Sequence, residues 1–104
     1  MFTMKKALIA ALMSLASATP ALADLALATS KNCMSCHQVE RKVLGPSFKD
    51  ISAKYKGNAG AGAMLADKIR KGGSGVWGPV PMPANNQVSE ADAKKLSAWV
   101  LSLP

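Results

Sequence analysis

Residues 33–37 read CMSCH, and this pentapeptide governs how the rest of the chain is interpreted. Two cysteines three positions apart on a helical turn present their sulfurs to one side, where both can form thioether bonds with the vinyl groups of a haem. The next residue, His37, is carried beneath the ring, where an imidazole nitrogen can bind the iron. The pattern predicts one covalently attached haem c, held by Cys33 and Cys36, with His37 as an iron ligand.

Two other uses of closely spaced cysteines fit this chain less well. A thioredoxin-like redox pair belongs in a βαβ context, and the sequence lacks the sustained alternation of apolar and polar residues that indicates strands. A zinc site needs four ligands. Cys33, Cys36 and His37 are too crowded to act together, and the sequence contains no second cluster of cysteine or histidine.

The sixth ligand of the iron separates electron transfer from ligand chemistry. His37 is the only histidine, so ligation by two histidines is excluded. Met34 lies inside the attachment turn and cannot reach across the ring. Met64 lies in a helical pattern, where a flexible apolar side chain is better explained by packing or by a surface position.

Met82 is the better candidate for the sixth ligand. It lies in a loop between Pro81 and Pro83. Proline fixes φ and removes a backbone donor, so this segment is stiff and can hold one side chain at a set depth. We therefore predict that Met82 binds the iron opposite His37, an arrangement that suits electron transfer and disfavours oxygen binding or catalysis.

The N-terminal residues 1–23 predict a cleaved secretory signal peptide. Lysines precede an apolar run at 7–16, and the small-residue tripeptide at 21–23 is followed by Asp24. The apolar run is well short of the roughly 20 residues that a bilayer span needs, so no membrane span is expected. Residues 24–104 then form one exported domain, small enough to need a cofactor at its core.

This domain is predicted to be all-α. Ser47 begins a capping-box pattern with Asp50, and Ser89 caps the last helix, whose apolar residues recur at helical spacing through Leu103. The expected helices span residues 24–32, 47–57, 58–71 and 89–103, and the irregular stretches span 38–46 and 72–88. Ordering such long loops costs entropy, which a bound ligand would offset.

The chain is basic, with a formal net charge of +7. Nucleic acid is an unlikely partner because the protein is exported and its basic residues are not clustered with aromatic ones. The basic residues either line solvated helix faces or steer the protein toward an acidic partner, which raises the rate of encounter more than the affinity.

From about Leu27 to Leu101 the sequence resembles the small bacterial class I c-type cytochromes of the c-551/c-552 (c8) group. Strings that match this family in order are CMSCH at 33–37, GP at 45–46, GVWGP at 75–79 and PMP at 81–83. The resemblance implies about four short helices wrapped around one haem, with the first and last helices crossing.

The resemblance also implies the function. It implies a periplasmic one-electron carrier, not an enzyme, that shuttles electrons between respiratory redox proteins such as nitrite reductase, cytochrome oxidase or a quinol-oxidising complex. We expect the carrier to be a monomer.

The resemblance assigns roles to three further residues. Pro46 would offer its carbonyl to the far ring nitrogen of His37 and so orient the imidazole. Trp77 would donate its indole N–H to a haem propionate, although simple core packing is an alternative. Asn85 would support the Met82 sulfur, although it could equally be a turn residue.

Two features depart from the family pattern. Lys68 stands where relatives often carry an arginine that contacts a propionate, and a lysine cannot make the same forked contact. Residues 85–88 are one residue longer than in close relatives, which mostly affects the entry to the last helix.

Three other functions stay open at this point. The chain could be an electron-transfer subunit bound to a dehydrogenase or oxidase, which a large exposed apolar patch would favour. A haem enzyme such as a peroxidase would need an open distal site instead of Met82. A redox or gas sensor would need an output domain, and the sequence shows none.

Overall fold

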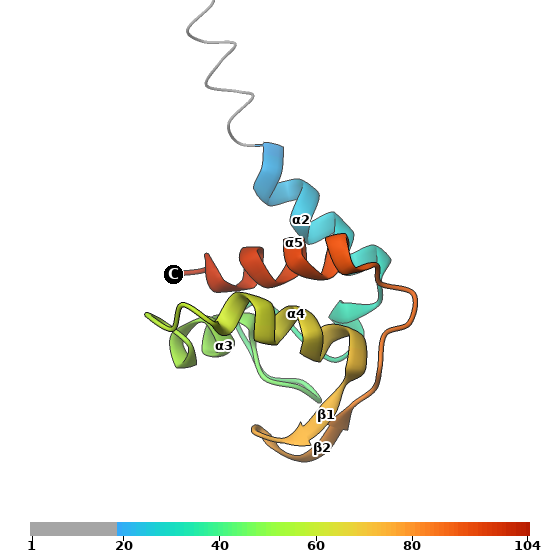
Figure 1. Cartoon of the computed structure of the whole chain (residues 1–104), viewed down its shortest axis with the longest axis vertical. Helices are drawn as coiled ribbons and strands as arrows, with labels where there is room; N and C mark the ends of the chain where they lie inside the picture. The colour runs from blue at the N-terminus through green and yellow to red at the C-terminus, as the bar shows by residue number, and fades with distance from the viewer. Residues whose placement is uncertain (1–18) are drawn as a thin grey trace, which may run out of the picture.

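The computed structural model describes residues 19–104 (Figure 1). Four α-helices, a short 3-10 helix and a small hairpin make up this part of the chain. In order they are α2 (Thr19–Ser30), η1 (Cys33–Ser35), α3 (Phe48–Lys54), α4 (Ala61–Lys71), β1 (Gly73–Gly75), β2 (Gly78–Met82) and α5 (Glu90–Leu101). Most of the predicted signal peptide lies outside the described residues.

The first and last helices of the described part cross, as predicted (Figure 1). Ala28 of α2 is fully buried at this crossing and shares a core cluster with Leu96 of α5. A side chain as small as alanine lets the two helix backbones approach closely. The helix α2 begins earlier than the predicted start at Asp24, so the expected cleavage point falls within it, and cleavage there stays a prediction.

The helix starts follow the capping signals in the sequence. The Ser47 hydroxyl accepts a hydrogen bond from the Asp50 amide at 3.0 Å, and Ser89 does the same for Asp92 at 3.1 Å. Each bond satisfies one of the amides that the first turn of a helix leaves unpaired. The predicted caps of α3 and α5 are therefore confirmed. Leu103 lies beyond the last turn of α5 but still packs against the core.

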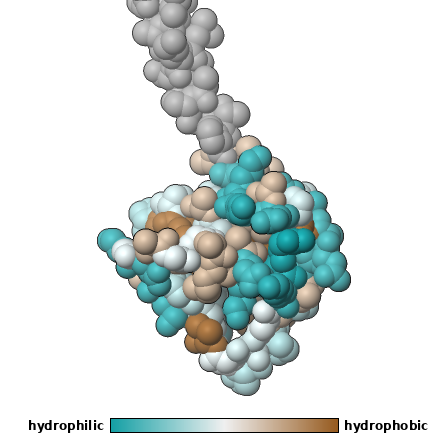
Figure 2. All heavy atoms as spheres, viewed as in Figure 1, coloured by the Kyte–Doolittle hydropathy of each residue, from teal (hydrophilic) through white to brown (hydrophobic). Residues whose placement is uncertain are grey.

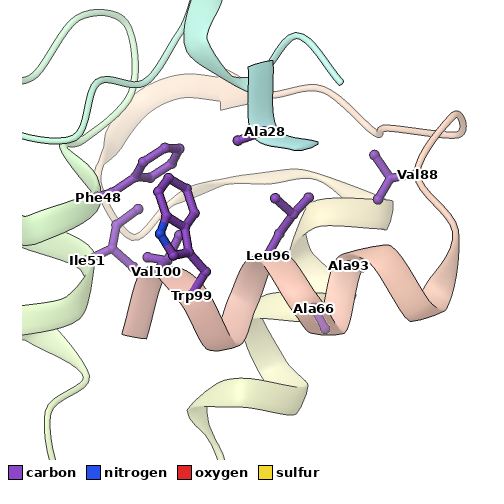
Figure 3. Close-up of a cluster of buried hydrophobic side chains, with 9 residues drawn as sticks. All are labelled: Ala28, Phe48, Ile51, Ala66, Val88, Ala93, Leu96, Trp99 and Val100. Carbon is purple, nitrogen blue, oxygen red and sulfur yellow. The ribbon is translucent and has the colours of Figure 1, made fainter. Parts of the chain in front are cut away.

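The core lies between α5 and the helices around it (Figure 3). Its largest pair is Phe48 and Trp99, whose rings meet edge to face with centroids 5.5 Å apart. Leu96 and Val100 extend the same face of α5. Burying each such side chain contributes about 1.5–3 kcal/mol, so this stripe is the main source of stability that the chain supplies on its own.

Two buried hydroxyls tie α5 to its neighbours. The Ser52 hydroxyl of α3 lies 3.2 Å from the Leu101 carbonyl oxygen and 2.7 Å from the Leu103 carbonyl oxygen, and it can donate its proton to either. These carbonyls lie at the end of α5, where helices leave acceptors without partners. Ser97 donates to the Gly62 carbonyl of α4 at 2.7 Å. Both serines thus fix the position of α5 relative to the other helices.

The prediction of an irregular stretch across 72–88 was wrong in its first half. Strands β1 and β2 pair antiparallel there, with Gly73 opposite Met82 and Gly75 opposite Gly78, and the register shifts between the two pairs. The hairpin extends from the end of α4, and β2 returns toward the helices (Figure 1). Met82 is the last residue of β2.

The molecular surface is mostly polar on the face shown in Figure 2, where strongly hydrophobic groups are few. Within residues 19–104, none of the helices has the length and apolar character needed to cross a membrane.

Candidate functional site

A cavity opens beside the core, between η1, the following loop, α4, α5 and the hairpin. It contains about 1260 Å³ of empty space, part of which is open to solvent. Its walls are mostly apolar, and Phe48 and Trp99 of the core form part of them. The cavity brings together every residue predicted for the site except Asn85, namely Cys33, Cys36, His37, Pro46, Trp77 and Met82.

The two cysteines lie on the turn that η1 forms after α2. Asn32 precedes the turn in a left-handed conformation with φ of 64°, which reverses the chain, and the His37 amide closes it by donating to the Cys33 carbonyl at 3.0 Å. Both cysteines are free and partly buried. Burial raises the pKa of the Cys33 thiol, and a backbone hydrogen bond partly offsets this effect.

His37 is held in one orientation at the cavity wall. Its side chain is only 8% exposed, and Nδ1 lies 2.7 Å from the Pro46 carbonyl oxygen. A carbonyl only accepts, so the proton is on Nδ1 and the lone pair of Nε2 stays free for a metal. The Phe48 ring stacks on the imidazole, with centroids 5.1 Å apart.

Gly45 is a part of this arrangement that residue-level reasoning missed. A Cβ atom at this position would lie 2.6 Å from His37 Cε1 and 2.9 Å from Nδ1. Only glycine lets the loop pass this close to the ring. The Gly45 amide also donates to the Cys36 carbonyl at 2.8 Å, which closes the loop. The only signal for it in the sequence was the family string at 45–46.

Met82 ends β2 and is half-buried at the cavity. A second glycine, Gly72, lies very close to the backbone of the Met82 segment. A Cβ on Gly72 would collide with the Met82 carbonyl and lie 2.8 Å from the Ala84 amide nitrogen. Gly72 also has φ of 74°, a conformation that favours glycine. The end of α4 and the Met82 segment are therefore in direct backbone contact.

Asn85 differs from the expectation. Its Nδ2 donates to the Ile69 carbonyl at 2.9 Å and to the Pro83 carbonyl at 3.3 Å. These two contacts use both protons of the amide, so the expected support of the Met82 sulfur is not among its hydrogen bonds. Asn85 instead fastens the Met82 loop to α4, and it does not line the cavity.

Trp77 lies at the tip of the hairpin and lines the cavity mouth. Trp77 is 41% exposed and lies outside the core cluster, and its contact with a propionate stays a prediction. Lys54 of α3 places its ammonium group 5.5 Å from the centroid of the Trp77 ring, a cation–π contact. Lys68 also lines the cavity, and its ammonium group reaches over Gly73.

The residues of the cavity fit a covalent haem c. Two cysteines, a histidine with an available Nε2 and a methionine line the same mostly apolar space. Across residues 19–104 there is no cluster of three His, Cys, Asp or Glu residues able to hold a bare metal ion.

The chain is similar to known cytochromes c. Residues 25–104 match the family described as Cytochrome c. The chain is 57% identical to cytochrome c-552 of Nitrosomonas europaea over 83 residues, which cover 80% of this chain and 81% of the relative. It is 49% identical to cytochrome c-552 of Hydrogenobacter thermophilus over 100 residues, covering 96% of this chain and 99% of the relative.

Solved structures show the same fold. The crystal structure of wild-type Nitrosomonas europaea cytochrome c552 superposes with a TM-score of 0.75 at 55% identity, covering 77% of this chain and 99% of that one. The chain therefore belongs to the cytochrome c family, as a small class I c-type cytochrome whose haem c is attached covalently through the CMSCH motif.

Proposed function

We propose that this haem-based electron carrier works in the periplasm with its iron ligated by His37 and Met82, and that it passes single electrons between respiratory redox proteins. One observation supports this most directly. The Pro46 carbonyl fixes the tautomer of His37 so that Nε2 is free, and Met82 reaches the same cavity from the hairpin.

The haem supplies a one-electron change at its iron, and the protein supplies the setting. A neutral thioether at Met82 favours reduced over oxidised iron and so raises the reduction potential. The Pro46 hydrogen bond makes His37 a more basic ligand and limits its rotation. With both side chains held by the fold, His37 and Met82 would stay bound to the iron in either redox state and would leave no open position for a substrate.

The cavity walls add a second effect. Apolar side chains, including Phe48, surround the space where the ring would lie. Such surroundings keep water away and limit the reorganisation that accompanies a change in charge. At the mouth we assign Trp77 to a haem propionate, in keeping with its place on the hairpin. Pro46 is assigned to orient His37, and Asn85 to support Met82 indirectly through the loop.

Location and partners extend the proposal. The signal-peptide pattern at 1–23 supports export. The basic surface supports docking to acidic faces of redox proteins, with nitrite reductase, cytochrome oxidase or a quinol-oxidising complex as the partners that the family suggests.

A second candidate function has one observation in its favour. Apolar side chains at the cavity mouth are more than half exposed, namely Leu44, Val76 and Val80. Such a patch would suit an electron-transfer subunit bound to a dehydrogenase or oxidase. Size-exclusion chromatography of the native protein distinguishes the two, since a free carrier elutes as a small monomer and a subunit elutes with its complex.

The test of the proposed function uses the full-length chain expressed in a bacterium that attaches c-type haem. The periplasmic fraction should contain a haem-bearing protein that lacks residues 1–23 by mass spectrometry. Its optical spectrum should change on reduction and should not respond to carbon monoxide. Carbon monoxide binding to the reduced wild-type protein would contradict a filled sixth position and would restore the peroxidase alternative.

A further inference from the structure

Side-chain amides connect the end of α2 to the loop that carries Met82. Gln87 Nε2 donates to the Lys31 carbonyl at 3.2 Å and lies 3.2 Å from Asn85 Oδ1. Asn85 then donates to the Pro83 carbonyl at 3.3 Å. The connection runs from the helix end just before the haem-attachment turn to the residue next to Met82.

The contact between Lys31 and Gln87 is reciprocal. Lys31 donates through its ammonium group to the Gln87 carbonyl at 3.3 Å, while the Gln87 amide returns a bond to the Lys31 carbonyl. The two residues are 56 positions apart, so this is a tertiary link and not a local turn. The next residue, Val88, is 1% exposed in the core and fixes the backbone beside it.

The contact between Lys31 and Gln87 joins two segments that both hold the haem site. On one side, α2 leads directly into the turn with Cys33 and Cys36, to which the haem is bonded. On the other side, Asn85 fastens the Met82 loop to α4 through the Ile69 and Arg70 carbonyls. Gln87 adds the connection from this loop to the segment that holds the haem.

We propose that Gln87 is a positioning residue that holds the Met82 loop against the haem-attachment segment and thereby slows displacement of the Met82 sulfur from the iron. The inference rests on the proposed ligation by Met82. Gln87 itself does not line the cavity. Its amide makes exposed hydrogen bonds, so losing them should change the displacement rate by about 3- to 10-fold.

The experiment compares four holoproteins: wild type, Gln87→Ala, Gln87→Met and Asn86→Ala. Gln87→Met keeps the side-chain length without the amide, and Asn86 is an exposed neighbour in the same loop. Proton NMR of the reduced proteins shows whether a methionine methyl group lies over the haem. Mixing the oxidised proteins with imidazole then gives the rate at which the methionine is displaced.

Both Gln87 variants should keep the methionine signal and lose Met82 about 3- to 10-fold faster, while Asn86→Ala stays within about twofold of wild type. Midpoints of unfolding should fall slightly, because the same hydrogen bonds also stabilise the folded state; a purely structural role would lower them and leave the displacement rate unchanged. Unchanged displacement in both Gln87 variants, or equal acceleration in Asn86→Ala, would overturn the inference. A wild-type protein without the methionine signal would instead overturn the proposed ligation and, with it, this role of Gln87.

Discussion

The Nδ1 atom of His37 lies 2.7 Å from the carbonyl oxygen of Pro46, and this contact decides which ring nitrogen faces the cavity. The ring is confined on other sides as well, since Phe48 stacks on it and Gly45 leaves no room for a Cβ atom. A histidine held by three neighbours in this way is confined to one ligand geometry.

Replacing Gly45 with alanine should disturb this geometry. The new methyl group would overlap the His37 ring, and relieving that contact means tilting the imidazole or moving the loop. We expect the free energy of unfolding of the holoprotein to fall by about 1–3 kcal/mol, the usual cost of overpacking. Denaturant unfolding measures the loss, and the absorption spectrum reports the change at the iron.

Gly62→Ala is the matched control for this substitution. Gly62 lies within α4, and a Cβ there would meet no atom within 4 Å. Alanine in a helix is favoured over glycine by about 0.5–1 kcal/mol, so this variant should be slightly more stable and keep the wild-type spectrum. Equal stability of the Gly45→Ala and wild-type proteins would show that the close approach at His37 is unimportant.

The attachment residues should govern both yield and stability. Cys33→Ala or Cys36→Ala removes one thioether link, and losing such a covalent cross-link should lower the free energy of unfolding by about 2–4 kcal/mol. His37→Ala should prevent a stable holoprotein, because the haem iron would lose the histidine ligand that the cavity wall supplies. Haem staining and thermal unfolding check these outcomes; a His37→Ala protein with native stability and spectrum would refute them.

Ser52 should contribute to stability without affecting the haem. Ser52→Ala removes the hydroxyl that serves the Leu101 and Leu103 carbonyls at the end of α5 and leaves them without that donor. The expected loss is about 1–3 kcal/mol. Because Ser52 does not line the haem cavity, the reduction potential should stay at the wild-type value. A shift in potential without a loss of stability would contradict this division of roles.

The basic surface leads to a kinetic prediction. If lysines steer docking, the rate of electron transfer to a purified acidic partner should fall as ionic strength rises, since salt screens exposed charges over distances of about 10 Å. Stopped-flow mixing at several salt concentrations measures this. A rate independent of salt would point to the exposed apolar residues at the cavity mouth as the docking surface.

Local signals predicted the helices well. Ser47 and Ser89 cap α3 and α5 because their side chains can satisfy helix amides within the same turn, an interaction that sequence spacing alone encodes. The hairpin was missed for the opposite reason. Its strands consist largely of glycine and proline, which have low strand propensity, and pairing of Gly73 with Met82 depends on the return of the chain from α4.

In the candidate site, too, the residues of a local motif could be predicted from the sequence, and the contacts between distant residues could not. The CMSCH motif is local, so Cys33, Cys36 and His37 could be singled out from spacing. The link from Lys31 to Gln87 joins residues far apart in sequence, and no periodicity indicates it. The Asn85 amide was expected near Met82, but the carbonyls of Ile69 and Pro83 are its partners, since loop geometry and not residue type decides where an amide donates.

The measurement that tests the central claim most directly is a redox titration of Met82→Ala beside Met64→Ala, with imidazole binding measured on both oxidised proteins. Met64 lies on α4 with 38% of its surface exposed and does not line the cavity, so it controls for the loss of a methionine. Ligation by Met82 predicts that Met82→Ala has a lower potential and binds imidazole more tightly by about tenfold or more, while Met64→Ala behaves as wild type. A Met82→Ala protein with the wild-type potential and imidazole affinity would contradict the claim that Met82 is the sixth ligand.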